Sequence, residues 1–85
     1  VQATRERIVH EKVDDRIWKD RIRVELKNRK PDPVRIEVIE KLSGSWEILK
    51  TSHDYTRLDS NRIRYEVTVP GESSLKLSYT VQYRY

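Results

Sequence analysis

The 85-residue sequence contains no cysteine, methionine or phenylalanine, and only two glycines and three prolines. Without cysteine the chain can form neither a disulfide nor a thiolate metal site, so the redox compartment stays open. Two histidines, His10 and His53, are too few for a structural zinc site without carboxylate partners. Because no apolar run approaches the ~18 residues of a membrane-spanning helix, the sequence predicts no transmembrane segment. We predict no cofactor and no metal ion.

Charged residues, in contrast, make up 38% of the chain, with a net charge of +4. Basic and acidic groups accompany each other: residues 1–42 hold 12 basic and 9 acidic side chains, and residues 43–85 hold 6 and 5, which gives +3 and +1. The densest basic stretch, Lys27 to Lys30, precedes a Pro-Asp-Pro turn instead of continuing along a helix. We interpret it as a solvated strand end and predict no nucleic-acid partner.

An alternation of apolar and charged residues dominates the chain and predicts half-buried antiparallel strands. It is clearest over residues 22–26, 34–38, 63–69 and 75–85, and a further short strand is expected over about 45–51. Turn-forming residues separate these runs at Pro31-Asp32-Pro33, Ser43-Gly44-Ser45, Asp59-Ser60-Asn61 and Pro70-Gly71. The successive apolar residues Val38 and Ile39 predict a bulge or a stretch covered on both faces.

The first twenty residues allow two interpretations. Val9, Val13 and Ile17 stand four apart, as on a surface helix. Asp14 and Asp15 instead fit a hairpin turn between a strand over residues 1–13 and one over 17–28, and we favour this interpretation because the rest of the chain is β. About seven short strands without a strong helix then predict an all-β fold, an immunoglobulin-like antiparallel β-sandwich, as a single domain over residues 1–85.

Ser52, His53 and Asp54 are the residue types of a catalytic triad. A triad needs the serine to meet one ring nitrogen of histidine while the aspartate holds the other, and neighbours on an extended chain point to opposite faces. The chain also lacks a Gly-x-Ser-x-Gly elbow. We therefore interpret the three residues as a polar crossing between two strands and predict that the protein is not an enzyme.

Two acidic groups of residues suggest other sites. Asp14, Asp15 and Asp20 supply carboxylates for a glycosidase or cation site, but an 85-residue sandwich has little room for a cleft. Asp59-Ser60-Asn61 begins like a calcium loop, yet the later glycine and the bidentate glutamate are missing. We interpret both as surface or turn residues. The sequence thus predicts no catalytic, cofactor-binding or metal-binding residue, and leaves any binding residues unknown.

The aromatic residues offer an alternative function. Trp18, Trp46 and five tyrosines could form a platform for stacking sugars, as carbohydrate-binding β-sandwiches do. Their phase places Trp18, Tyr65, Tyr79 and Tyr83 in apolar rows, whereas Tyr55 and Tyr85 are expected at the surface. Buried tryptophans would exclude the platform, and coplanar exposed rings would favour it.

Two segments resemble a known family: VELKNRKPDPVRIEVIEKLSGSWEI and, later, YEVTVPGESSLKLSYTVQYRY. The pattern comprises a strand ending in Asn28, a Lys-x-Pro connection, a strand from Pro33-Val34, Glu40-x-Leu42, Trp46-Glu47-Ile48, Val69-Pro70 and Leu77-x-Tyr79-x-Val81. Over roughly residues 20–85 this is similar to the C-terminal β-sandwich domain of unknown function of the mucoidy-inhibitor-like proteins. The resemblance implies a terminal domain of a longer, exported bacterial protein, in the cell envelope or otherwise outside the cytoplasm, without catalytic residues.

Together these observations predict a non-catalytic structural or protein-interaction module of a larger protein. The start at Val1 without methionine also suggests a segment of a longer chain. The expected partner is the rest of that polypeptide or another protein, bound through an exposed sheet edge or loop. The alternative is an accessory carbohydrate-binding module that uses exposed aromatic residues.

Overall fold

The computed structural model describes residues 2–85, which form seven strands and no helix. The strands are β1 (Gln2–Asp14), β2 (Ile17–Asn28), β3 (Val34–Lys41), β4 (Ser45–Thr51), β5 (Thr56–Asp59), β6 (Arg62–Val69) and β7 (Ser73–Arg84). The predicted all-β fold of about seven strands is confirmed. Within these residues no helical segment has the length and hydropathy needed to cross a membrane.

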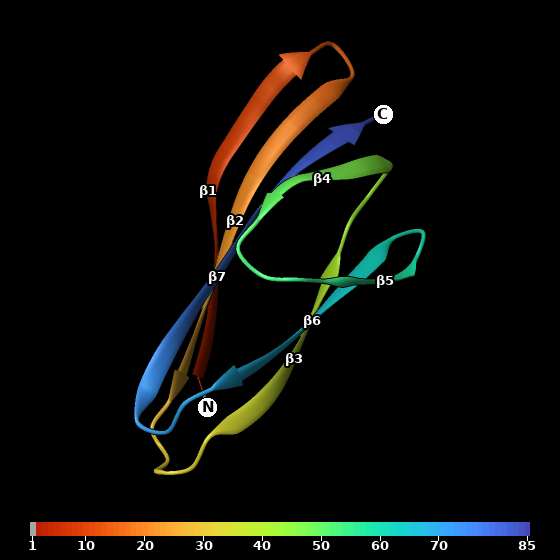
Figure 1. Cartoon of the computed structure of the whole chain (residues 1–85). Helices are drawn as coiled ribbons and strands as arrows, with labels where there is room; N and C mark the ends of the chain where they lie inside the picture. The colour runs from red at the N-terminus through yellow and green to blue at the C-terminus, as the bar shows by residue number, and fades with distance from the viewer. Residues whose placement is uncertain (1) are drawn as a thin grey trace.

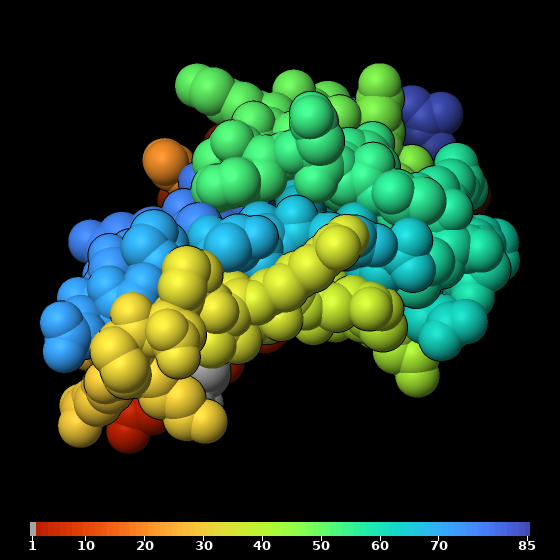
Figure 2. Space-filling view, turned by 60° about the horizontal axis from the view of Figure 1, so that its bottom comes forward, coloured from red at the N-terminus to blue at the C-terminus, as the bar shows by residue number. Residues whose placement is uncertain are grey.

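The strands form two antiparallel sheets that pack face to face as a β-sandwich (Figure 1). The first sheet has the order β1-β2-β7-β4, and the second has the order β3-β6-β5. In the space-filling view β3, β5 and β6 lie across the front, and β1, in red, shows only in small areas at the margin (Figure 2). The strand β1 is an outer strand of the first sheet, because among the described strands it pairs with β2 alone.

The core lies between β2, β6 and β7, whose inward residues alternate with exposed ones as the period of two predicts. Its buried apolar side chains are Ile22, Val24, Leu26, Leu42, Ile63, Tyr65, Val67, Val69, Leu77, Tyr79, Val81 and Tyr83. Burial of the three tyrosines is confirmed, and the rings of Tyr65 and Tyr79 lie 5.9 Å apart between centroids.

Gln2–Asp14 forms a strand, so the favoured interpretation is confirmed for these residues, whereas Val1, where the predicted strand began, lies outside the described residues. A turn at Asp15 and Arg16 joins β1 to β2, with Gln2 opposite Lys27 and Asp14 opposite Ile17. All 13 residues of β1 are exposed, so this strand lengthens the sheet without adding a buried side chain to the core. Val9 and Val13 lie on β1 and Ile17 lies on β2, so the spacing of four that resembled a helix spans the hairpin.

Two details differ from expectation. Thr56–Asp59 forms the short, exposed strand β5, which is not among the strands that the alternation predicts. The prediction for Val38 and Ile39 is wrong, because β3 pairs with β6 without a register shift. Ile39 lies opposite Arg64 on the outer face of the second sheet and is 48% exposed, so an aliphatic side chain simply stands among charged ones there.

The side chain of Asn28 fastens the loops at one end of the sandwich. Its Nδ2 donates to the carbonyl oxygens of Asp32 (2.8 Å), Val69 (3.3 Å) and Pro70 (3.2 Å), and its Oδ1 accepts from the Lys30 N–H (3.0 Å). Since Asn28 is 2% exposed, Asn28→Ala leaves these backbone groups without their partner. We expect the free energy of unfolding, measured by urea denaturation, to fall by about 2 kcal/mol.

Asn61→Ala is the matched control, because the Asn61 side chain is exposed and makes no hydrogen bond to another residue in the described range. It should shift the urea midpoint little, corresponding to roughly 0.5 kcal/mol or less. Equal effects of the two substitutions would contradict the role assigned to Asn28.

Candidate interaction surface on β1

The three triad-like residues lie in a bend between β4 and β5. Ser52 Oγ and His53 Nδ1 are 2.7 Å apart, because the chain bends here and is not extended as the prediction assumed. The Asp54 side chain makes no hydrogen bond or ion pair to another described residue. Ser52 Oγ accepts the Ser78 N–H (2.9 Å), and the Ser52 N–H donates to the Ser78 carbonyl (2.9 Å). The serine thus fastens the bend to β7, as in a polar crossing.

Both tryptophans are half-buried, and each has a ring face occupied by a neighbouring side chain. The Trp18 ring stacks on His10, with centroids 4.6 Å apart and planes inclined by 11°. The Arg57 guanidinium lies 4.6 Å from the Trp46 ring centroid, and Trp46 Nε1 donates to the Ser60 carbonyl (2.7 Å). The tryptophans are neither fully buried nor exposed as coplanar rings, so neither arrangement considered for the sugar platform is found. Because each ring has a face occupied by a neighbour, sugar stacking on these rings has less support.

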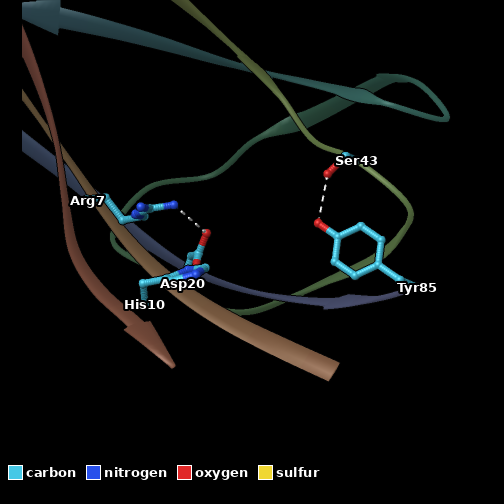
Figure 3. Close-up of polar contacts among 5 residues, drawn as sticks. All are labelled: Arg7, His10, Asp20, Ser43 and Tyr85. Carbon is cyan, nitrogen blue, oxygen red and sulfur yellow. Dashed lines mark hydrogen bonds and ion pairs between the residues drawn. The ribbon is translucent and has the colours of Figure 1, made fainter. Parts of the chain in front are cut away.

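The two tyrosines expected at the surface are there. Tyr55 is 38% exposed and Tyr85 is 59% exposed. The Tyr85 hydroxyl lies 3.0 Å from Ser43 Oγ on the β3–β4 connection (Figure 3), and its ring is stacked with that of Tyr83 at 6.2 Å between centroids. The Tyr85 side chain therefore links the end of β7 to the β3–β4 connection, and part of its ring stays in solvent.

Of the strands with a free edge in the described chain, β1 is the longest. Eleven of its 13 residues pair with β2, and its opposite edge pairs with no other described strand. Pairing is regular over Gln2–Arg7 and resumes over Val9–Lys12 after a bulge at Ile8. Along this edge the backbone N–H and C=O groups have no partner strand, which is the usual template for adding one.

The charges of β1 are sorted by face. Side chains directly opposite each other in a sheet share a face, and Arg5, Arg7 and His10 stand opposite the buried β2 residues Val24, Ile22 and Asp20. The inner row of β1 is therefore Ala3, Arg5, Arg7, His10 and Lys12. The outer row is Gln2, Thr4, Glu6, Val9, Glu11 and Asp14. All cations of the strand lie in the inner row, and all carboxylates lie in the outer row.

Two buried carboxylates face the inner row, and the first is Asp20 on β2. The His10 Nδ1 lies 2.5 Å from Asp20 Oδ1, and Arg7 Nη1 lies 4.0 Å from Oδ2. Figure 3 shows Arg7 and His10 both reaching from β1 toward this carboxylate. The interpretation of Asp20 as a surface or turn residue is wrong, because it lies within β2 and is only 8% exposed. A buried carboxylate needs such partners.

The second buried carboxylate is Glu40 on β3, which links β1 to both sheets. It accepts from Arg5 Nε (2.8 Å) and from the Tyr79 hydroxyl (2.6 Å). The hydrogen bond from Arg5 to Glu40 raises the pKa of that guanidinium. Burial, and then the neighbouring Glu40, raise the pKa of Tyr79, so the phenol stays protonated as a donor.

The outer row is already matched by β2. Arg23 Nη2 lies 2.9 Å from Glu6 Oε2, and Lys19 stands opposite Glu11 in the register. Opposite charges at facing positions of an antiparallel pair stabilise it. The two rows of β1 thus differ: two of the three outer carboxylates face cations of β2, whereas cations outnumber carboxylates on the inner side.

Comparisons with known proteins give no family for this chain. No family model, curated protein or solved structure matches it. The resemblance to the mucoidy-inhibitor-like proteins, and the exported location that it implies, therefore stay predictions.

Other parts of the described chain offer less for binding. Within residues 2–85, no three His, Cys, Asp or Glu side chains are grouped closely enough to hold a metal ion. A shallow hollow of about 480 Å³ lies where the ends of β2 and β7 meet. It is lined by Lys27, Asn28, Arg29, Glu72, Ser73 and Ser74.

Proposed function

We propose that this chain is a non-catalytic protein-interaction module that binds an extended segment of a partner along the free edge of β1. The observation that carries this proposal is a 13-residue strand that is paired on one side only and has no buried residue. Such a strand adds little to the core, yet it holds a long row of backbone groups in a fixed, extended geometry.

Strand addition supplies affinity through main-chain hydrogen bonds and specificity through alternate side chains. The regular run Gln2–Arg7 offers six consecutive residues for such a ladder. Beyond it, Ile8 (42%), Val9 (39%) and Val13 (51%) are exposed apolar side chains that a partner would cover. The bulges and charges of β1 are features that hinder uncontrolled edge pairing, so a partner must match this strand specifically.

We further infer an immunoglobulin-like module within a larger, exported protein, so that the partner is the rest of that polypeptide or another protein. The division into four and three strands supports this type. Relative to the constant-type immunoglobulin order, however, β5 and β7 have exchanged places. Carbohydrate binding stays the alternative, with less support from the tryptophan geometry.

A backbone-directed experiment tests the proposal. Capped ten-residue peptides of alternating Thr-Gln, Thr-Glu, Thr-Lys and Thr-Val are titrated into the ¹⁵N-labelled protein, and amide shifts are followed by NMR. At least one peptide should shift the amides of Gln2–Arg7, because the added ladder changes their hydrogen bonding. The same peptide with N-methyl groups at alternate residues should not, since it cannot complete the ladder.

Two results would overturn the proposal. In the first, no peptide of the panel shifts the β1 amides. In the second, the shifts fall on the other outer strands, β3, β4 or β5, which would place the receptive edge elsewhere. Soluble oligosaccharides titrated in the same way test the carbohydrate alternative, for which shifts near Trp18 and Trp46 are expected.

A further inference from the structure

We propose that the strand added to β1 is an acidic one, with carboxylate side chains at alternate positions that face the inner row of β1. This inference rests on the proposed function and names the chemistry of its partner. It follows from three properties of the inner row: its excess of cations, their exposure, and the geometry of a neighbouring strand.

The inner row is only partly neutralised. It carries three permanent cations, Arg5, Arg7 and Lys12, which face two buried carboxylates, Asp20 and Glu40. The side chains of Arg5 and Arg7 remain 52% and 54% exposed although each is near a carboxylate. Within the described chain Lys12 has no carboxylate partner, and its Nζ lies 5.9 Å from the Trp18 ring centroid. The unmatched positive charge therefore faces solvent beside the free edge.

An added strand would place every second side chain directly beside this row, because facing residues share a face. The existing neighbour β2 already follows the same pattern on the other side of β1. It sets the acidic Asp20 opposite His10 on the inner face and the basic Arg23 opposite Glu6 on the outer face. Acidic residues on the inner face of a new strand would repeat that complementarity at the free edge.

A second copy of β1 does not fit this requirement. Two identical strands paired antiparallel about a two-fold axis bring inner row beside inner row, so Arg5, Arg7 and Lys12 would stand among cations. Like charges at facing positions are destabilising. A strand with basic residues on its inner face is disfavoured for the same reason, which leaves an acidic segment of a different sequence as the matching partner.

The bulge at Ile8 produces this arrangement. In a regular strand Arg5 and Arg7 would share one face, while His10 and Lys12, at even positions, would lie on the other. The extra residue at position 8 reverses the alternation, so that all four side chains reach the same face. Because the bulge places like charges side by side at a sheet edge, it favours binding of an oppositely charged partner over packing within the sheet.

The test compares three capped ten-residue peptides, alternating Thr-Glu, Thr-Gln and Thr-Lys, by NMR titration of the same protein. The Thr-Glu peptide should bind about tenfold more tightly than Thr-Gln, as expected for a few facing charge pairs of about 0.5 kcal/mol each. Its shifts should centre on β1, and the gain should shrink at high salt. A single-stranded oligothymidylate provides an anionic probe that is not a peptide strand.

Two double variants locate the preference on one face. Arg7→Gln with Lys12→Gln removes two charges from the inner row, and Lys19→Gln with Arg21→Gln removes two from the outer face of β2. The inner variant should lose most of the tenfold preference, whereas the outer variant, with the same net charge, should keep it. Urea denaturation of both variants confirms that each is folded during the titration.

The outcomes separate this inference from the proposed function. Equal binding of Thr-Glu and Thr-Gln peptides on β1 overturns the acidic partner but leaves strand addition intact. Absence of any shift on β1 overturns both. Equal losses in the inner and outer variants, or tighter binding of the oligothymidylate on the same residues, also overturn the inference, because they indicate general charge attraction instead of facing pairs.

Discussion

Replacing Gly71 by alanine should lower the free energy of unfolding by at least about 3 kcal/mol. A Cβ atom at this position would lie 1.9 Å from the carbonyl oxygen of Pro31 and 2.5 Å from its carbonyl carbon. The obstacle is backbone, so no side chain can rotate away. The φ of Gly71 lies outside the left-handed region, and the steric contact between the β2–β3 and β6–β7 connections is the whole cause.

The two connections have little freedom to separate. The Glu72 N–H donates to the Lys30 carbonyl (2.8 Å), and the Asn28 amide spans both connections through Asp32 and Pro70. Urea denaturation measures the loss, and Ser74→Ala, an exposed change three residues away, should alter the midpoint little. A Gly71→Ala variant within about 1 kcal/mol of the wild type would show that the two connections do not pack this closely.

Most of the sandwich could be predicted because burial follows the period of two. The strands β2, β6 and β7 each have one apolar and one polar face, and such a strand can pack on a core only with its apolar face. The strand β5 could not be predicted in this way, because none of its four residues is buried and it has no apolar row. Its place is set by the turn at Ser60 and Asn61 and by pairing with β6.

The candidate surface could be predicted only in part. The polar residues Asp20 and Glu40 visibly interrupt two apolar rows, which signals that a buried charge needs partners. The identity of those partners depends on the bulge at Ile8, which decides the face that His10 and Lys12 occupy. Such a bulge depends on long-range pairing with β2 and leaves no local signal in the sequence.

Raising the pH from 8 to 11 should lower the free energy of unfolding by about 3 kcal/mol or more, chiefly through the buried tyrosines Tyr79 and Tyr83. Burial also raises the pKa of Tyr65, which adds to the loss. Burial, and then the nearby Asp20, raise the pKa of Tyr83 to about 12, and burial with Glu40 raises the pKa of Tyr79. In the unfolded chain both phenols ionise near pH 10, so above that pH the folded state binds more protons. The stabilisation is complete below pH 10 and is lost as the pH rises toward each folded-state value.

At pH 11, one unit above the pKa of an unfolded tyrosine, each tyrosine that stays protonated in the folded state lowers the free energy of unfolding by about 1.4 kcal/mol. Urea denaturation at pH 8, 9, 10 and 11 measures the loss, and tyrosinate absorbance shows when the phenols ionise. The Tyr79→Phe variant should lose the part of the dependence that comes from Tyr79 and retain the rest, because Tyr83 and Tyr65 still titrate. If its loss equals that of the wild type, Tyr79 does not stay protonated beside Glu40, and the link from β1 through that carboxylate to β7 is not the one described.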